Sequence, residues 1–372
     1  MTELNIHTET LAAVFAVSVA LGALTARTGF CTMGAVSDWV NMGDLGRMRS
    51  WMLAVATAIA GVAAMEAGGV IDLTTTYPAY RAPQLAWLRN IAGGLLFGVG
   101  MTLASGCGNK TLVRIGGGNL KSLFVLVVAG GFAYLMNYTD FNHAVFGWTH
   151  EFTVPLEPSG MSSQSLSAIL AGLAGIDAAR THAVLPWLLA GALALWVFSS
   201  AEFRRNPDQL AGGLGFGVAV LLGWWLTAGP RAAAWKEFAE FSEVVPSRVE
   251  AQSYTFVAPM ADTARYLADP GNTSLINFGV MALAGVIVGA FLYALVSRRF
   301  RIEFFRNAGD LVRHGVGGAL MSIGGVLALG CTIGQGITGV STLAFGSFLA
   351  LLSMIAGCAL TMKLTLWWMM RE

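Results

Sequence analysis

Long apolar runs separated by shorter polar connections make up most of the chain. A helix needs about 20 apolar residues to cross a bilayer. Several runs are short or contain glycines, so some are expected to be re-entrant half-helices. Nine runs come close enough in length to predict about nine transmembrane helices, at 11–26, 51–70, 88–105, 119–138, 186–201, 211–229, 275–297, 314–330 and 345–368. The pattern therefore predicts an all-α integral membrane protein that forms a single polytopic domain over residues 1–372.

Composition agrees with this class. The mean hydropathy is +0.65, and only 12% of the residues are charged. A soluble domain would carry about twice that share of charge. The net charge of +1 gives no reason to expect a nucleic-acid partner. The four cysteines form no CxxC pair and no cluster with histidine, so no disulfide scaffold, metal site or cofactor is expected.

The distribution of arginine predicts the orientation. Basic residues gather in three connections, at Arg47 and Arg49, at Arg204 and Arg205, and between 298 and 313. Positively charged loops tend to stay in the cytoplasm. The long connections 139–185 and 230–274 are then expected outside, the second as an interfacial amphipathic helix followed by a loop. This assignment places the N-terminus outside and the C-terminus inside, in the cytoplasm.

A nineteen-residue segment occurs twice. Arg89–Cys107 reads RNIAGGLLFGVGMTLASGC, and Arg313–Cys331 reads RHGVGGALMSIGGVLALGC. Without gaps the two copies share nine residues, including the glycine pair and the final Gly-Cys. The predicted orientation sends the copies through the membrane in opposite directions. The sequence thus predicts two inverted, pseudo-symmetric halves, 1–140 and 206–372, joined by a connecting span and loop at 141–205, with a shared site near mid-membrane.

Three cysteines lie beside glycines that interrupt apolar helices: Cys31 in TGFCTMG, Cys107 in SGCGNK and Cys331 in LGCTIGQG. A broken helix exposes backbone N–H groups that suit an anion. Polar neighbours that could stabilise such an anion are Lys110, Asn109, Gln335 and Thr332. For Lys110 two positions remain open, at membrane depth beside Cys107 or extended to the cytoplasmic surface. Glycines can also serve only close helix packing.

Thiols suit a path that must bind weakly. A buried thiol stays protonated and donates only a weak hydrogen bond. Conduction needs successive sites that hold an ion loosely enough to release it. Three such donors in series favour transport of a sulfur-containing anion. Cys358, in the middle of the last apolar run with no break beside it, is interpreted as a packing residue.

At these motifs the chain resembles the YeeE/YedE membrane family. The matching segments include LGALTARTGFCTMGAVSDWV, IAGGLLFGVGMTLASGCGNKTLVRIGGG and GGALMSIGGVLALGCTIGQGITG. The resemblance implies an hourglass-like helical fold, uptake of thiosulfate or a related sulfur oxyanion, and a relay through Cys31, Cys107 and Cys331. It also implies a cytoplasmic sulfurtransferase partner of the TusA-like kind. The segment GCGNKTLVR departs from the small-residue run expected after the first Gly-Cys, which leaves the preferred sulfur species open.

Two other functions remain as alternatives. A membrane thiol enzyme that forms persulfides or exchanges disulfides would need an activated thiolate, for which Lys110 beside Cys107 is the only indication. A structural or assembly protein would use the glycine-rich repeats for packing alone. No CxxC pair supports the enzyme, and packing alone does not account for a thiol at the same place in both repeats.

Overall fold

The structure is a computed structural model, which describes residues 5–371. Helices dominate it, and a short antiparallel pair of strands joins two loops. The first six helices are α1 (Ile6–Thr28), α2 (Thr32–Met42), α3 (Gly46–Ala67), α4 (Trp87–Leu103), α5 (Gly108–Gly116) and α6 (Leu120–Tyr138). The two strands are β1 (Gln84–Leu85) and β2 (Val154–Pro155).

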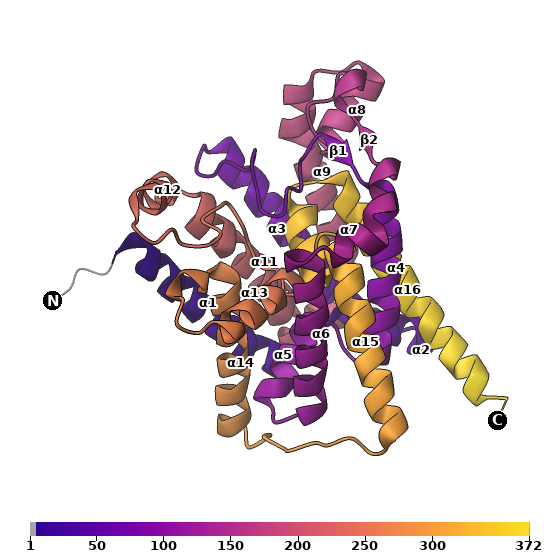
Figure 1. Ribbon diagram of the computed structural model, residues 1–372. Coiled ribbons are helices and arrows are strands. Elements are labelled where there is room, and N and C mark those ends of the chain that lie inside the picture. Colours follow the sequence, from indigo (N-terminus) through magenta and orange to yellow (C-terminus); the bar gives the residue numbers. More distant parts are fainter. Residues whose placement is uncertain (1–4, 372) are drawn as a thin grey trace.

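The central part of the chain is less regular. It contains α7 (Phe141–Phe146), η1 (Gly147–Phe152), η2 (Glu157–Ser159), α8 (Leu166–Ala174), α9 (Ala178–Phe198) and α10 (Ala201–Arg204). The last part contains α11 (Pro207–Ala228), α12 (Ala232–Phe241), α13 (Val257–Ala268), η3 (Thr273–Leu275), α14 (Phe278–Val296), α15 (Ala308–Leu327), η4 (Gly334–Gly339) and α16 (Phe345–Met369). In Figure 1 the connection between α14 and α15 runs along one end, while α8 and the strands lie at the opposite end.

Within residues 5–371, eight helical segments are long and apolar enough to cross a membrane. They include α1 with α2 and α4 with α5 as broken spans, together with α3, α6, α9, α11, α14 and α16. This confirms the predicted class, an all-α integral membrane protein. The ninth predicted span, 314–330, falls mainly on α15. That helix is less apolar, because Asp310, Arg313 and His314 lie in its first two turns and glycines recur along it.

The two copies of the repeat lie on α4 and α15, which pack against each other in opposite directions. A Cβ atom on Gly93 would lie 2.6 Å from the amide nitrogen of Ala328, and one on Gly317 would lie 2.5 Å from that of Ala104. Gly93 and Gly317 are equivalent in the repeat, as are Ala104 and Ala328. The contact is therefore repeated with the two helices exchanged, as a local two-fold axis requires.

Neighbouring helices follow the same relationship. The first repeat helix, α4, packs parallel to α16, and the second, α15, packs parallel to α6. Likewise α1 contacts α14, and α3 contacts α11. Glycines make these approaches close: Gly98 would place a Cβ 2.7 Å from the amide nitrogen of Cys358. Small residues at helix contacts are the usual means of packing in membranes, where lipid and side chains are equally apolar.

The expectation that 230–274 is an interfacial helix and a loop is only partly right. The amphipathic helix is α12, but the chain from Ala251 to Asp262 is buried inside the helix bundle. Its polar backbone is held by side chains, since Thr227 and Thr338 donate hydrogen bonds to the carbonyls of Gln252 and Tyr254 at 2.6 and 2.7 Å. Irregular backbone is tolerated inside a membrane only where the protein itself bonds its polar groups, and these hydrogen bonds do so for two of its carbonyls.

Candidate functional site: three thiols at helix breaks

The first break lies between α1 and α2. Gly29 has φ +68°, a left-handed conformation that glycine adopts without a Cβ clash and that ends α1. Cys31 then serves as the N-cap of α2, and its sulfur accepts a hydrogen bond from the amide of Gly34 at 3.5 Å. Since the sulfur is the acceptor, the S–H proton remains available to another group.

The two repeats break in the same way. Ser105 has φ +59° and Leu329 has φ +60°, and these residues are equivalent in the repeat. A left-handed conformation is unfavourable for residues with a Cβ, so its occurrence at both positions marks a local geometry that the fold maintains. Cys107 follows as the N-cap of α5. Cys331 precedes a short helix with the π-helical segment η4, and its sulfur accepts from the amide of Gly334 at 3.4 Å.

All three predicted thiols are buried in the same core, and we refer to Cys31, Cys107 and Cys331, together with the polar residues beside them, as the thiol row. The exposed fractions of Cys31, Cys107 and Cys331 are 6%, 1% and 0%. Cys31 and Cys107 interact through their side chains. The hydroxyl of Thr332, the residue after Cys331, lies beside Cys107. The row therefore connects a break in the first half of the chain with one in the second.

Polar atoms without partners gather at this row. Thr32 Oγ1, Thr332 Oγ1 and both side-chain polar atoms of Asn109 are buried and make no hydrogen bond within residues 5–371. An unsatisfied buried polar group costs about 1–3 kcal/mol, so native proteins keep few of them. Each of these residues lies one or two positions after a cysteine. The site is buried, yet it offers unused donors.

Threonine hydroxyls elsewhere behave differently. Among the described residues, every other buried threonine except Thr255 donates to a backbone carbonyl. Thr255 instead faces sulfur, with its Oγ1 3.9 Å from the Sγ of Cys331. Free threonine hydroxyls are thus a property of the thiol row and not of the bundle as a whole.

The remaining predicted residues occupy different surroundings. Gln335 is fully engaged: its amide donates to the carbonyl of Ala328 at 2.5 Å and accepts from Ser347 at 2.5 Å. It ties the end of α15 to the start of α16. Lys110 is partly exposed, its stem packs on Gly106, and its charge acts on Cys31. The structure gives Lys110 no ion-pair partner among the described residues.

A second cation also acts on Cys31. Arg47 forms a two-point ion pair with Asp38 of α2, which is 4% exposed. The guanidinium also contacts Gly34, where a Cβ would collide with it. Arg47 was assigned only to a cytoplasmic connection by the sequence pattern, but it also lies close enough to Cys31 to interact with it electrostatically.

Sequence reasoning missed Thr255, although a signal was present. Cys107 and Cys331 differ in number by 224, and the same difference relates Cys31 to Thr255 and Asp38 to Asp262. Both aspartates are buried and pair with an arginine, Arg47 or Arg248. Applying the spacing of the two Gly-Cys motifs to Cys31 would have found Thr255 without a structure.

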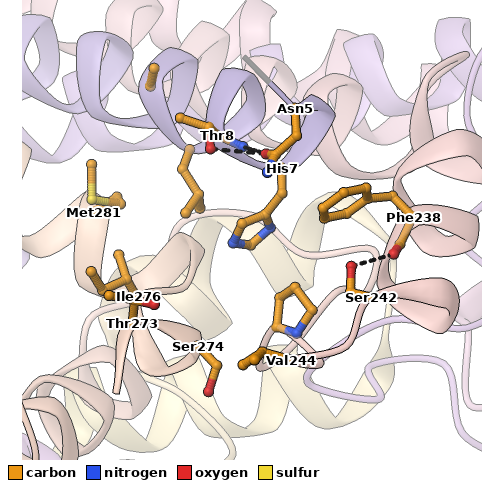
Figure 2. A pocket seen from close by; sticks show the side chains of 13 residues that line it. Asn5, His7, Thr8, Phe238, Ser242, Val244, Thr273, Ser274, Ile276 and Met281 are labelled. Atoms are coloured by element: carbon orange, nitrogen blue, oxygen red, sulfur yellow. Dashed lines mark hydrogen bonds between the residues drawn. The ribbon is translucent and has the colours of Figure 1, made fainter. Parts of the chain in front are cut away.

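Other features lie away from the row. Cys358 is fully buried in α16 and accepts a hydrogen bond from Thr102 at 3.3 Å, which agrees with a packing role. A pocket of about 460 Å³ lies where the start of α1 meets α12 and the segment around η3. In Figure 2 the ring of His7 points into it between Phe238 and Val244. It contains none of the predicted site residues.

Fold and site together define a multi-pass membrane protein with a buried row of thiols and hydroxyls. A family model described as sulphur transport matches residues 27–360, so the chain belongs to this family of transporters. The resemblance to YeeE/YedE proteins is thereby confirmed. The thiosulfate transporter TsuA of Escherichia coli (strain K12) is 25% identical over 342 residues, 91% of this chain and 89% of that protein. A thiosulfate transporter TsuA of Spirochaeta thermophila is 28% identical over 284 residues, 72% and 74% of the two chains.

Proposed function

We propose that this protein imports thiosulfate, or a closely related sulfur oxyanion, across the bacterial inner membrane through the row of Cys331, Cys107 and Cys31. The observation that carries the proposal is the set of unused donors along the row, at Thr32, Asn109 and Thr332. A passing anion would satisfy them in turn, because it accepts hydrogen bonds from hydroxyl, amide and thiol groups alike.

The donors match the requirement for weak, sequential binding. Neutral thiols and hydroxyls hold an anion less tightly than charged groups do, so it can leave each position for the next. The start of α5 adds backbone N–H groups and a partial positive charge near Cys107. Gln335 contributes in this scheme by holding the ends of α15 and α16 in place, because its own polar atoms are already bonded.

The order of the thiols across the membrane follows from the arginine-rich connections. With the positive connections in the cytoplasm, the N-terminus is periplasmic, α15 serves as the ninth crossing, and the halves 1–140 and 206–372 are inverted. Cys331 then lies toward the outside and Cys31 toward the inside. Lys110 and Arg47 would attract the anion at the inner end. A cytoplasmic TusA-like sulfurtransferase is the expected acceptor of the sulfur there.

Uptake of labelled thiosulfate into proteoliposomes tests the function. Cys107→Ala and Cys331→Ala should each lower the uptake rate about tenfold or more, as expected when a donor to a charged group is lost. Cys358→Ala is the matched control, since it removes a buried thiol outside the row. Unchanged uptake in both test variants would contradict the proposal. A persulfide trapped on Cys107 during turnover would favour the membrane thiol enzyme instead.

A further inference from the structure

Cys331 has a neighbour, Thr255, that lies outside the three cysteine motifs. Cys31 interacts with Cys107 on one side of the local two-fold axis. On the other side the residue equivalent to Cys31 is Thr255, and its hydroxyl lies 3.9 Å from the sulfur of Cys331. The two pairs are related by the 224-residue spacing of the repeats. The row thus ends in a thiol pair at one end and in a hydroxyl–thiol pair at the other.

The Thr255 hydroxyl is free to bind a ligand. The side chain is 8% exposed, and its only hydrogen-bonding neighbour within residues 5–371 is the sulfur of Cys331, at the long limit for such a contact. Gly334 permits this placement, because a Cβ there would collide with Thr255 Oγ1. Buried threonines away from the row, such as Thr102 and Thr338, use their hydroxyls to bond carbonyls.

A cavity is lined by the chain segments that adjoin this pair. It has a volume of about 400 Å³, and its lining includes Val257, Leu329 and Gly330. Gly330 immediately precedes Cys331, and Val257 is two residues after Thr255. Thr76, Tyr77 and Glu250 from two connecting loops line it as well. Residues next to Cys331 and two positions after Thr255 thus belong to the wall of this cavity.

We propose that Thr255 and Cys331 form an outer binding station that selects an anion carrying both oxygen and sulfur. The inference rests on the proposed function and deepens it. The Thr255 hydroxyl donates to an oxygen of the anion, and the Cys331 thiol donates to its terminal sulfur. Hydroxyl donors prefer the harder oxygen acceptor, whereas a polarizable thiol tolerates sulfur. Sulfide would lack the first contact, and sulfate would lack the second.

The station is tested by uptake kinetics of Thr255 variants in proteoliposomes. Thr255→Val keeps the shape but removes the donor, and it should raise the KM for thiosulfate about tenfold, the value of one hydrogen bond to a charged acceptor. Thr255→Ser restores the hydroxyl and should return KM to within about twofold of the wild type. Thr102→Val is the control, because it removes a buried threonine hydroxyl that lies off the row. An unchanged KM in Thr255→Val would overturn the inference.

Selectivity gives the second measurement. Thr255→Cys replaces the hydroxyl by a thiol and makes the outer pair resemble the inner one. Inhibition of thiosulfate uptake by sulfide should become stronger in this variant, and unchanged relative inhibition would also contradict the station. If Thr255→Val does not fold, the test uses the sulfide inhibition of Thr255→Cys and the KM of Thr255→Ser instead. If the wild-type protein takes up no thiosulfate, the proposed function is refuted. If the wild type is active but the Thr255 variants keep its KM and its inhibition by sulfide, only the outer station is refuted.

Discussion

Gly100 of α4 faces Gly317 of α15 so closely that a Cβ atom on Gly317 would lie 2.9 Å from the carbonyl oxygen of Gly100. The equivalent pair, Gly324 and Gly93, repeats the approach with the helices exchanged. The helix backbones are in direct contact along this seam, immediately before each helix breaks at its cysteine. The seam thus fixes the positions of both repeat thiols relative to each other.

Substitution in the seam should cost stability. Gly317→Ala forces α4 and α15 apart, and the expected loss is about 1–3 kcal/mol, as for overpacking of a tight core. Gly131→Ala is the matched control, since no atom lies within 4 Å of a Cβ built on this glycine of α6. Thermal unfolding in detergent should show a lower midpoint for Gly317→Ala only. Equal midpoints for the two variants would mean that the seam does not hold the repeats together.

The predicted orientation can be checked by labelling. Gly271 lies in an exposed turn between α13 and α14, and Phe304 is 66% exposed between α14 and α15. A membrane-impermeant maleimide added to whole cells should label Gly271→Cys, and should label Phe304→Cys only after the membrane is opened. The native cysteines are buried and give a low background. The reverse labelling pattern would invert the topology and the proposed order of the thiols.

Much of this arrangement was predictable from sequence. The apolar runs predicted the class, and the two Gly-Cys repeats predicted where α4 and α15 break. Hydropathy could not show that the chain from Ala251 to Asp262 is buried, because that segment mixes small, polar and aromatic residues and crosses no membrane as a helix. Its burial depends on hydrogen bonds from Thr227 and Thr338, which are distant in sequence.

The candidate site was predictable at the level of residue type but not of bonding. Cys107 and Thr332 belong to different repeats, and only the antiparallel packing of those repeats brings them together. Gln335 looked like a free donor in the sequence, yet its amide joins Ala328 and Ser347. A polar residue near a thiol is thus a ligand candidate only when its donors and acceptors are not already hydrogen-bonded to neighbouring backbone or side chains.

Lys110 should contribute to the affinity for the anion. Its charge acts on Cys31 and has no carboxylate partner among the described residues. Lys110→Met should raise the KM for thiosulfate roughly fivefold, since a partly exposed charge contributes about 1 kcal/mol at this range. Lys110→Arg keeps the charge and should behave like the wild type. Equal loss in both variants would assign Lys110 a packing role, and no loss in either would place its ammonium group outside the path.

Thr332 offers the sharpest separation of function from stability. Its hydroxyl is fully buried and unbonded, so Thr332→Val removes an unsatisfied polar atom and keeps the shape. The unfolding midpoint in detergent should stay the same or rise, by up to about 1 kcal/mol in stability, because the desolvation cost disappears. Thiosulfate uptake should nevertheless fall, since the donor beside Cys107 is lost. Thr338→Val is the contrasting variant: its hydroxyl bonds the carbonyl of Tyr254, so its loss should lower stability. A Thr332→Val protein that is destabilised but transports normally would show that the hydroxyl serves the fold and not the anion.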